Sequence, residues 1–306
     1  MLKKSSGVLC EKPAVKYAFI NTSGGKLPVE RKCKLLGVSP SGYYKYLNRK
    51  PSPREQKHEM LVKNIRRVFD KSRQTYGCRR VHQDLVRSGI DCNKNTVAAL
   101  MKKHAIAPRR RRKYKSTTDS KHKFACNENL LNREFTGGRP NLVWMSDITY
   151  IETKQGWLYL TVFIDRFSKQ VVGWKAGSEI NAKLVLDAFE EAQISTGETP
   201  LMVHSDRGIQ YVSESFRKKL RQVRCIQSMS RKANCWDNAV SESFFGALKS
   251  EMIYRSTFET REQATAALFD YIEIFYNRSR LHSALGYLTP VEFALKGKTV
   301  VQSAFS

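Results

Sequence analysis

The sequence has no CxxC pair and no apolar run near the ~18 residues that a membrane-spanning helix needs. Its seven cysteines leave one unpaired in any complete disulfide scheme, and no signal peptide is recognisable. We therefore predict reduced thiols, a cytoplasmic protein and no membrane span. Cys225, Cys235 and His204 have the wrong spacing for zinc ligands, so no zinc site is expected.

Acidic residues are scarce in the first 125 of the 306 residues, which hold 32 Lys and Arg against 8 Asp and Glu, a net charge of +24. Residues 126–306 hold 22 Lys and Arg against 20 Asp and Glu, so nearly all of the total charge of +26 lies in the N-terminal part. This asymmetry favours an N-terminal part that binds a polyanion, with nucleic acid as the leading partner. A membrane surface is the weaker interpretation, because no basic amphipathic helix with a broad apolar face stands out.

Residues 1–50 are predicted to form a helix-turn-helix-like segment, after a loose lead-in over residues 1–27. A short helix ends at Gly37, and Ser39 and Pro40 then suit the N-cap and the first position of a second helix. A plain helical hairpin whose tyrosines form the core is the alternative, and we weigh the two evenly.

Residues 54–107 are predicted to form a three-helix DNA-binding domain. Apolar residues recur at helical spacing from Leu61 to Phe69, again from Val81 to Leu85, and a third time beyond Asn95, the expected N-cap. The alternative is that the surrounding charges only solvate a small bundle, but the charge imbalance favours DNA. The basic residues expected to contact DNA here are Arg79, Arg80, Lys94, Lys102 and Lys103.

Residues 108–140 are predicted to be a basic linker. Its densest run is Arg109, Arg110, Arg111, Arg112 and Lys113. Such a run is extended when free and can neutralise several phosphates, with binding that weakens steeply as salt rises. A role as a solubilising linker is the weaker alternative.

Residues 141–257 are predicted to form an α/β catalytic core, followed by a helical extension over residues 258–306. The predicted strands are Val143–Ile151, Trp157–Asp165, Gln170–Lys175, Leu201–Ser205 and Ile226–Ser230. Three meandering strands followed by alternating helix and strand is the order of the ribonuclease H-like fold. The aromatic and basic residues of the extension are expected to pack more than to contact DNA.

Three carboxylates stand out in this core. Asp147 lies within a predicted strand, Asp206 follows another, and Glu242 lies in the first turns of a long helical pattern. Carboxylates brought together from two strands and a helix suit hard divalent cations. Two such ions, about 3.5–4 Å apart, can activate an attacking oxygen and stabilise a leaving one in phosphodiester chemistry.

Three other carboxylates compete for the role of metal ligand. Asp165 ends a strand and suits a turn, Asp237 suits a helix cap, and Glu251 lies off the helical face of Glu242. We expect structural roles for all three.

Basic residues near the carboxylates are expected to contact DNA. Lys249 lies seven residues after Glu242 and so nearly on the same helical face, which suits contact with a phosphate at the scissile bond. Arg207 is next to Asp206 and either orients that carboxylate or neutralises phosphate. Arg231 and Lys232 precede the helix in a predicted loop and suit phosphate contact.

Several long motifs resemble those of bacterial insertion-sequence transposases of the IS-three family, in particular their downstream, OrfB-type catalytic polypeptide. The motifs are Trp144 with Asp147-Ile148-Thr149-Tyr150, Val172-Gly173-Trp174, His204-Ser205-Asp206-Arg207-Gly208, Gln227–Lys232, Asn234–Ala239, Glu242-Ser243-Phe244-Phe245 and Tyr276–Pro290. The resemblance runs from about residue 15 to about residue 295. It implies a retroviral-integrase-like core preceded by small all-α helix-turn-helix-type DNA-binding units.

The resemblance implies an Asp, Asp, Glu triad at Asp147, Asp206 and Glu242, with 35 residues between the last two. It further implies a DNA transposase that cleaves element ends and joins the 3′ hydroxyl to a phosphodiester, with Mg²⁺ held by the triad and Mn²⁺ as a substitute. The implied partners are double-stranded DNA (terminal repeats and target), a second copy of the chain on DNA, and the upstream-frame polypeptide. The implied location is the nucleoid in the bacterial cytoplasm.

Two other functions stay open at this point. The chain can be a non-catalytic DNA-binding regulator or inhibitor of a full-length transposase, although three intact carboxylates argue against a decayed site. It can also be a generic metal-dependent nuclease, which would cut DNA but never join ends.

Overall fold

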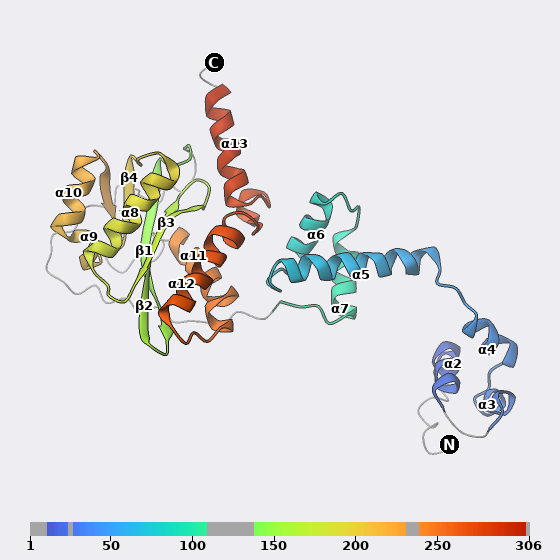
Figure 1. The fold of residues 1–306 in the computed structure, drawn as a ribbon. Coiled ribbons are helices and arrows are strands. Elements are labelled where there is room, and N and C mark those ends of the chain that lie inside the picture. Colours follow the sequence, from blue (N-terminus) through green and yellow to red (C-terminus); the bar gives the residue numbers. More distant parts are fainter. Residues whose placement is uncertain (1–10, 24–26, 109–137, 231–238, 304–306) are drawn as a thin grey trace. The chain divides into compact units, whose positions relative to one another are not determined.

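The computed structural model describes residues 11–23, 27–108, 138–230 and 239–303 (Figure 1). The chain separates into two compact units, residues 1–63 and residues 64–306. The division falls inside the helix α5 (Pro53–Lys71).

The first unit holds three short helices before α5. They are α2 (Pro13–Thr22), α3 (Val29–Leu35) and α4 (Pro40–Leu47). The prediction of a loose lead-in was wrong, because α2 forms there and buries Ile20 in a small core with Cys33. Only Ile20 is fully buried along α2, so its sequence carries little of the periodicity that signals a helix.

The start of α4 is as predicted. The side chain of Ser39 accepts a hydrogen bond from the amide of Gly42 at 2.9 Å, and Pro40 occupies the first helical turn. A serine cap satisfies one of the amides that the first turn of a helix leaves without a partner.

The predicted three-helix unit is present as α5, α6 (Cys78–Arg87) and α7 (Lys94–Lys103). The prediction of Asn95 as a cap was wrong. Asn93 caps α7 instead, and its side-chain oxygen accepts from the amide of Asn95 at 2.8 Å. The sequence offers two asparagines two residues apart, and only backbone geometry distinguishes them.

A mixed sheet of five strands forms the core of the second unit. The strands are β1 (Val143–Thr153), β2 (Gly156–Asp165), β3 (Val171–Gly177), β4 (Met202–Ser205) and β5 (Ile226–Met229). The spatial order is β3-β2-β1-β4-β5. The first three strands form the predicted antiparallel meander, and β4 and β5 run parallel to β1.

Helices cover both faces of the sheet (Figure 1). One face packs against α8 (Ala182–Thr196), α9 (Ile209–Val212) and α10 (Glu214–Gln222). The other face packs against α11 (Ala239–Glu251) and α12 (Arg261–Phe269). This layering is the ribonuclease H-like architecture that the order of elements predicted.

Gly173 lets β3 and α8 approach closely. A Cβ added there would lie 2.5 Å from the backbone nitrogen of Ala192 and 2.6 Å from the carbonyl oxygen of Ala188. No side chain fits at this distance, so close packing of β3 against α8 explains the glycine in the motif Val172-Gly173-Trp174.

The chain after α11 continues as η2 (Ile253–Arg255), α12, a π-helical segment η3 (Asp270–Tyr276), η4 (Ser283–Leu285) and α13 (Pro290–Ser303). Tyr271, Phe275 and Tyr276 are buried against the sheet, so the prediction that these aromatic residues pack is confirmed.

This C-terminal extension also contacts the segment from α5 to α6. Arg73 forms an ion pair with Asp270 at 2.8 Å. The hydroxyl of Tyr76 accepts from the amide of Leu281 at 2.7 Å and donates to the carbonyl of Ser279 at 3.2 Å. Tyr76 is buried, so these bonds are shielded from water.

Candidate active site

Asp147 and Asp206 are brought together by the alignment of two parallel strands. β4 pairs with β1 only from Val143 to Ser146, and Ser205, at the end of β4, is the partner of Ser146. The next residue on each strand is therefore a carboxylate, at the point where the ladder ends. Both are partly exposed. The carboxyl ends of parallel strands are the usual place for a site in α/β proteins.

A tight turn holds Asp206 in place. Its Oδ1 accepts a hydrogen bond from the amide of Gly208 at 2.9 Å. A Cβ at Gly208 would lie 3.1 Å from that same oxygen and 2.9 Å from Oε1 of Gln210, so a side chain there would displace one of these two groups. The neighbouring Arg207 donates from Nε to the carbonyl of Ser230 at 2.9 Å, which ties the turn to the end of β5.

Carboxyl groups lie close together at the end of the β1–β4 ladder. Burial, the nearby charge of Asp206 and that of Glu242 raise the pKa of Asp147 to about 8, against the opposing effect of Lys249. Partial desolvation also raises the pKa of Glu242, although its side chain is exposed. Neighbouring carboxylates repel each other unless a cation lies between them, and oxygen donors of this kind suit Mg²⁺ or Mn²⁺.

Tyr211 lies near enough to the two aspartates for their charges to act on it, and it was not identified from the sequence. Its hydroxyl is 2.8 Å from Oγ of Ser146, which itself donates to the carbonyl of Val162 at 2.9 Å. The tyrosine hydroxyl is therefore the donor to Ser146. Burial, followed by the charges of Asp206 and Asp147, raises the pKa of Tyr211 well above its usual range.

Glu242 lies in the first turn of α11 and is exposed. It is among the charges that raise the pKa of Asp147. Across the described part of the chain, however, no three His, Cys, Asp or Glu side chains converge closely enough to hold a metal ion. The sheet thus fixes the positions of Asp147 and Asp206 relative to each other, whereas Glu242 belongs to a separate helix.

Two of the competing carboxylates have structural roles. Asp165 accepts from the amide and the hydroxyl of Ser168, at 2.8 and 2.5 Å, and holds the turn after β2. Glu251 forms a buried ion pair with Arg280, at 2.8 and 2.7 Å. Asp237 lies outside the described residues.

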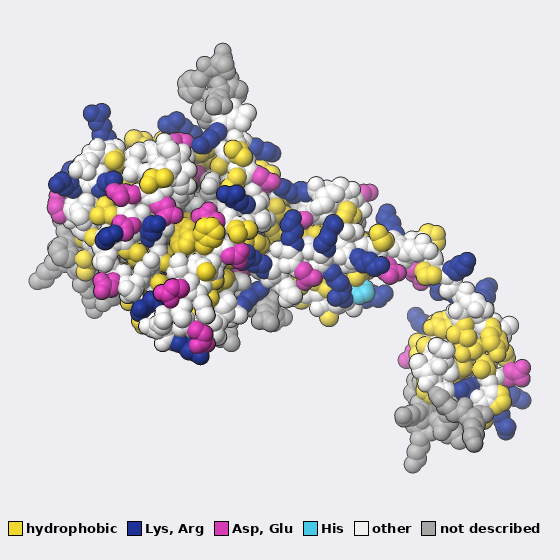
Figure 2. All heavy atoms as spheres, in the orientation of Figure 1, with side chains coloured by type: hydrophobic (Ala, Val, Ile, Leu, Met, Phe, Trp, Pro, Cys, Tyr) yellow, Lys and Arg dark blue, Asp and Glu magenta, His cyan; other side chains and the backbone are white. Residues whose placement is uncertain are grey.

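The basic residues predicted to contact DNA differ in their surroundings. Arg79, Lys94, Lys102 and Lys103 are exposed on α6 and α7. Arg80 is partly buried, with its guanidinium 5.7 Å from the ring centroid of Tyr76. In the space-filling view, Lys and Arg side chains crowd the surface over α5 to α7, whereas both signs of charge alternate over the α/β core (Figure 2).

Lys249 is partly buried on α11, with its Nζ 5.6 Å from the ring centroid of Tyr150. Burial lowers the pKa of Lys249, and the charge of Asp147 opposes this. The remaining predicted DNA contacts, Arg109 to Lys113 with Arg231 and Lys232, lie outside the described residues. No helix within the described ranges is both long and apolar enough to cross a membrane.

The order of the strands and the helices on both faces of the sheet define an integrase-like α/β core preceded by a helical region. Residues 137–235 and residues 242–296 match two families that are both described as "Integrase core domain". Residues 55–114 match the family "HTH-like domain".

Full-length relatives give the family. The chain is 37% identical over 286 residues to the transposase InsF for insertion sequence IS3A of Escherichia coli (strain K12), covering 92% of this chain and 99% of that protein. It is 42% identical over 249 residues to the transposase for insertion sequence element IS904 of Lactococcus lactis, covering 81% and 98%. It is 39% identical over 265 residues to an uncharacterized 31 kDa protein of insertion element IS600 of Shigella sonnei, covering 86% and 97%. The chain belongs to the IS3 family of insertion-sequence transposases.

Solved structures of viral integrases are also similar to the chain. One is the HTLV-2 integrase catalytic core domain in complex with magnesium, with 20% identity, a TM-score of 0.41 and coverage of 52% of this chain and 99% of that chain. Another is a simian T-cell lymphotropic virus intasome, with 17% identity, a TM-score of 0.44 and coverage of 69% of each chain.

Proposed function

We propose that this transposase cleaves DNA at the ends of its insertion element and joins the freed 3′ hydroxyl to another phosphodiester. The observation that carries the proposal is the register of β1 and β4, which puts Asp147 and Asp206 next to each other where the ladder between these two strands ends. Membership of a transposase family supports the same chemistry.

In this proposal Asp147, Asp206 and Glu242 are the metal ligands. Bound Mg²⁺ (or Mn²⁺) would activate the attacking oxygen and stabilise the leaving one. Glu242 would complete the set from the exposed first turn of α11. The turn at Gly208 and the hydrogen bond of Tyr211 to Ser146 hold the aspartates in position.

The bond changes need no energy-supplying cofactor. In cleavage, water adds to the scissile phosphorus, the P–O3′ bond breaks, and a 3′ hydroxyl and a 5′ phosphate result. In joining, that hydroxyl attacks a second phosphodiester, so one P–O bond forms as another breaks.

DNA binding is divided among several segments in this proposal. The segments 1–50 and 54–107 bind duplex DNA, while the core 141–257 carries the reaction. Lys249 and Arg207 neutralise phosphates at the site, and the exposed lysines of α7 bind the DNA backbone. Two element ends require at least two copies of the chain, and the upstream-frame polypeptide is a further partner.

The test is an assay of cleavage and joining on oligonucleotides that carry the element's ends. Wild type is compared with Asp206→Asn, in Mg²⁺ or Mn²⁺ and in Ca²⁺. The matched control is Asp187→Asn, because Asp187 pairs with the exposed Lys183 on α8, away from the site. Joined products from wild type and the control, absent in Asp206→Asn and in Ca²⁺, are the expected result.

Other outcomes would favour the alternatives. Cleavage without joining indicates a nuclease. Salt-sensitive binding with no reaction in any protein indicates a regulator or a chain that needs its upstream-frame partner. Equal joining by Asp206→Asn and wild type refutes the proposed site.

A further inference from the structure

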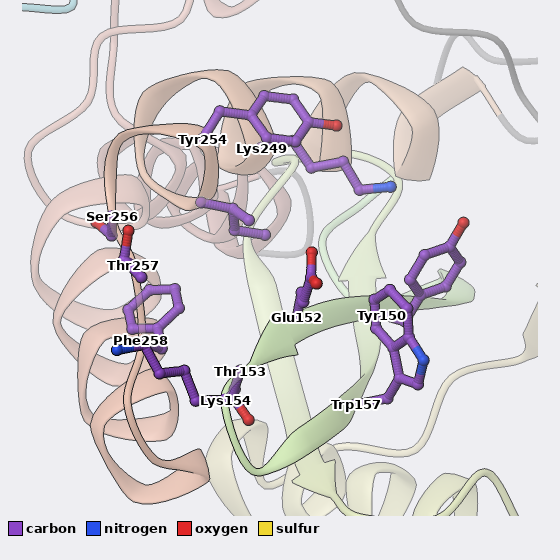
Figure 3. A pocket seen from close by; sticks show the side chains of 11 residues that line it. Tyr150, Glu152, Thr153, Lys154, Trp157, Lys249, Tyr254, Ser256, Thr257 and Phe258 are labelled. Atoms are coloured by element: carbon purple, nitrogen blue, oxygen red, sulfur yellow. The ribbon is translucent and has the colours of Figure 1, made fainter.

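A groove opens between the β1–β2 hairpin and the end of α11 together with the segment that follows it (Figure 3). Its volume is about 400 Å³. The hairpin contributes Tyr150, Glu152 and Trp157, and the other side contributes Lys249, Tyr254 and Phe258. We refer to it as the Tyr150–Trp157 groove.

The two aromatic residues of the hairpin are unusually open to solvent. Tyr150 is 44% exposed and Trp157 is 46% exposed. Their ring centroids are 5.1 Å apart and the rings are nearly perpendicular, at 85°. Because the rings are perpendicular, one exposed ring offers its face to a nucleobase and the other contacts the edge of that base.

The groove also has charge that suits a nucleotide. Lys249 lines it and lies near the ring of Tyr150, where its ammonium can meet a phosphate. The side chain of Glu152 points into the space between the hairpin and α11 (Figure 3). A carboxylate there can accept hydrogen bonds from the exocyclic amino group of a base.

The groove shares the strand β1 with Asp147, although neither aspartate lines it. Tyr150 follows Asp147 by three residues on β1, about 10 Å along the strand, and the two side chains leave opposite faces of it. At the ~3.4 Å rise of stacked nucleotides, this distance corresponds to at most about three nucleotides. Lys249 lines the groove and is close enough to Asp147 for the charge of that carboxyl group to act on it, so it connects the groove with the site.

We propose that the Tyr150–Trp157 groove binds one unpaired nucleotide of the DNA strand, within about three nucleotides of the scissile phosphate. The base packs on Tyr150 and Trp157, and its phosphate meets Lys249. A space of about 400 Å³ suits a single nucleotide, and only an unpaired base presents an open face for stacking. This inference rests on the proposed function, and it adds that the end of the element is locally unpaired when bound.

The first test measures binding of the full chain without divalent ions, so that the result does not depend on catalysis. The DNA is an element end with three unpaired nucleotides, compared with the same end fully paired. Trp157→Ala is expected to raise the Kd for the unpaired end at least about 5-fold, and Trp157→Phe to restore it. The Kd for paired DNA is expected to stay within about 2-fold, because α5–α7 bind the duplex.

The matched control is Phe269→Ala, which removes another aromatic side chain that is 54% exposed, on α12 outside the groove. It is expected to bind both DNAs as wild type does. An equal rise in Kd for Trp157→Ala and Phe269→Ala, or no rise for Trp157→Ala, overturns the proposal.

The second test locates the nucleotide. Photoreactive 5-iodouracil is placed at each of the first four positions beside the scissile phosphate, and crosslinked peptides are identified by mass spectrometry. A crosslink to residues 150–157 at one position supports the groove, and crosslinks confined to other peptides refute it. If the crosslink forms while Asp206→Asn joins DNA as well as wild type, the groove stands and the proposed active site fails.

Discussion

At the scale of single residues, the hydroxyl of Tyr211 stabilises the strand β1 next to Asp147 through its hydrogen bond to Ser146. Tyr211→Phe removes its hydrogen bond to Ser146 but keeps the ring, which is fully buried. We expect a loss of about 1 kcal/mol in the free energy of unfolding and a several-fold slower joining reaction, because the strand next to Asp147 is held less firmly. Urea denaturation and a joining time course measure the two effects. A variant that matches wild type in both would show that Tyr211 only fills space.

His282 gives a prediction about pH. Burial, followed by the charges of Arg280, Arg80 and Lys169, lowers the pKa of His282 to about 3 from an ordinary value of 6.5. As the pH falls below 6.5, His282 is protonated in the unfolded chain but stays neutral in the folded chain. The free energy of unfolding therefore decreases by at most about 1.4 kcal/mol per pH unit.

The measurement for His282 is urea denaturation of wild type and His282→Gln at pH 7, 6 and 5. The variant lacks this proton, so its free energy of unfolding should depend less on pH over that window. Parallel pH profiles of the two proteins would contradict the assignment.

At the scale of the elements, the two ends of the helix α11 have different partners. Its first turn carries Glu242, whereas Glu251 at its last residue is paired with Arg280 and accepts from the hydroxyl of Tyr271 at 2.9 Å. Glu251→Gln would leave the charge of Arg280 buried without its counter-ion, at a cost of about 3–5 kcal/mol.

Thermal and urea denaturation test this prediction. The control is Glu214→Gln, which breaks the exposed ion pair of Glu214 with Arg221 and should cost at most about 1 kcal/mol. Similar costs for the two variants would mean that the pair at the end of α11 contributes no more than a surface pair.

The contact between β3 and α8 gives a second prediction at this scale. Gly173→Ala puts a Cβ against the backbone of α8 and should cost about 1–3 kcal/mol, through displacement of the helix. Gly246→Ala on α11 is the control, because an added Cβ there meets nothing within 4 Å and alanine favours a helix. Equal free energies of unfolding for Gly173→Ala and wild type would show that β3 and α8 can move apart freely.

Most elements of the core were predictable because each strand has a clear run of apolar residues between turns. Caps were less predictable, as the choice of Asn93 over Asn95 shows. The helix α2 was missed because it buries only Ile20. Long-range pairs such as Glu251 with Arg280 join residues 29 apart in the sequence, and no local pattern signals them.

The same limit applies to the candidate site. Asp147 and Asp206 could be predicted from local strand patterns and a family resemblance. Tyr211 could not, because its role depends on the partner that Ser146 finds across the sheet. The groove at Tyr150 and Trp157 depends on the diagonal placement of two strand residues and on the path of the chain after α11.

At the scale of the whole molecule, the concentration of positive charge at the front predicts how binding responds to salt. Lys102→Ala with Lys103→Ala removes two exposed charges from α7. The slope of log K against log salt should become shallower by about 1 for each phosphate that the protein no longer neutralises. Lys183→Ala on α8, whose side chain is 78% exposed, is the control and should leave the slope unchanged. An unchanged slope in the double variant would remove α7 from the DNA-binding surface.

The bonds of Arg73, Tyr76 and Arg87 to the C-terminal extension have a consequence for modularity. Tyr76 bonds to the backbone at Ser279 and Leu281, and Arg87 pairs with Glu292 at 2.5 Å. If the helices α5–α7 were replaced by those of a relative, the C-terminal extension would therefore present contact residues that match the original helices. Hybrid transposases with new end specificity would need these helices and the C-terminal extension to be exchanged together.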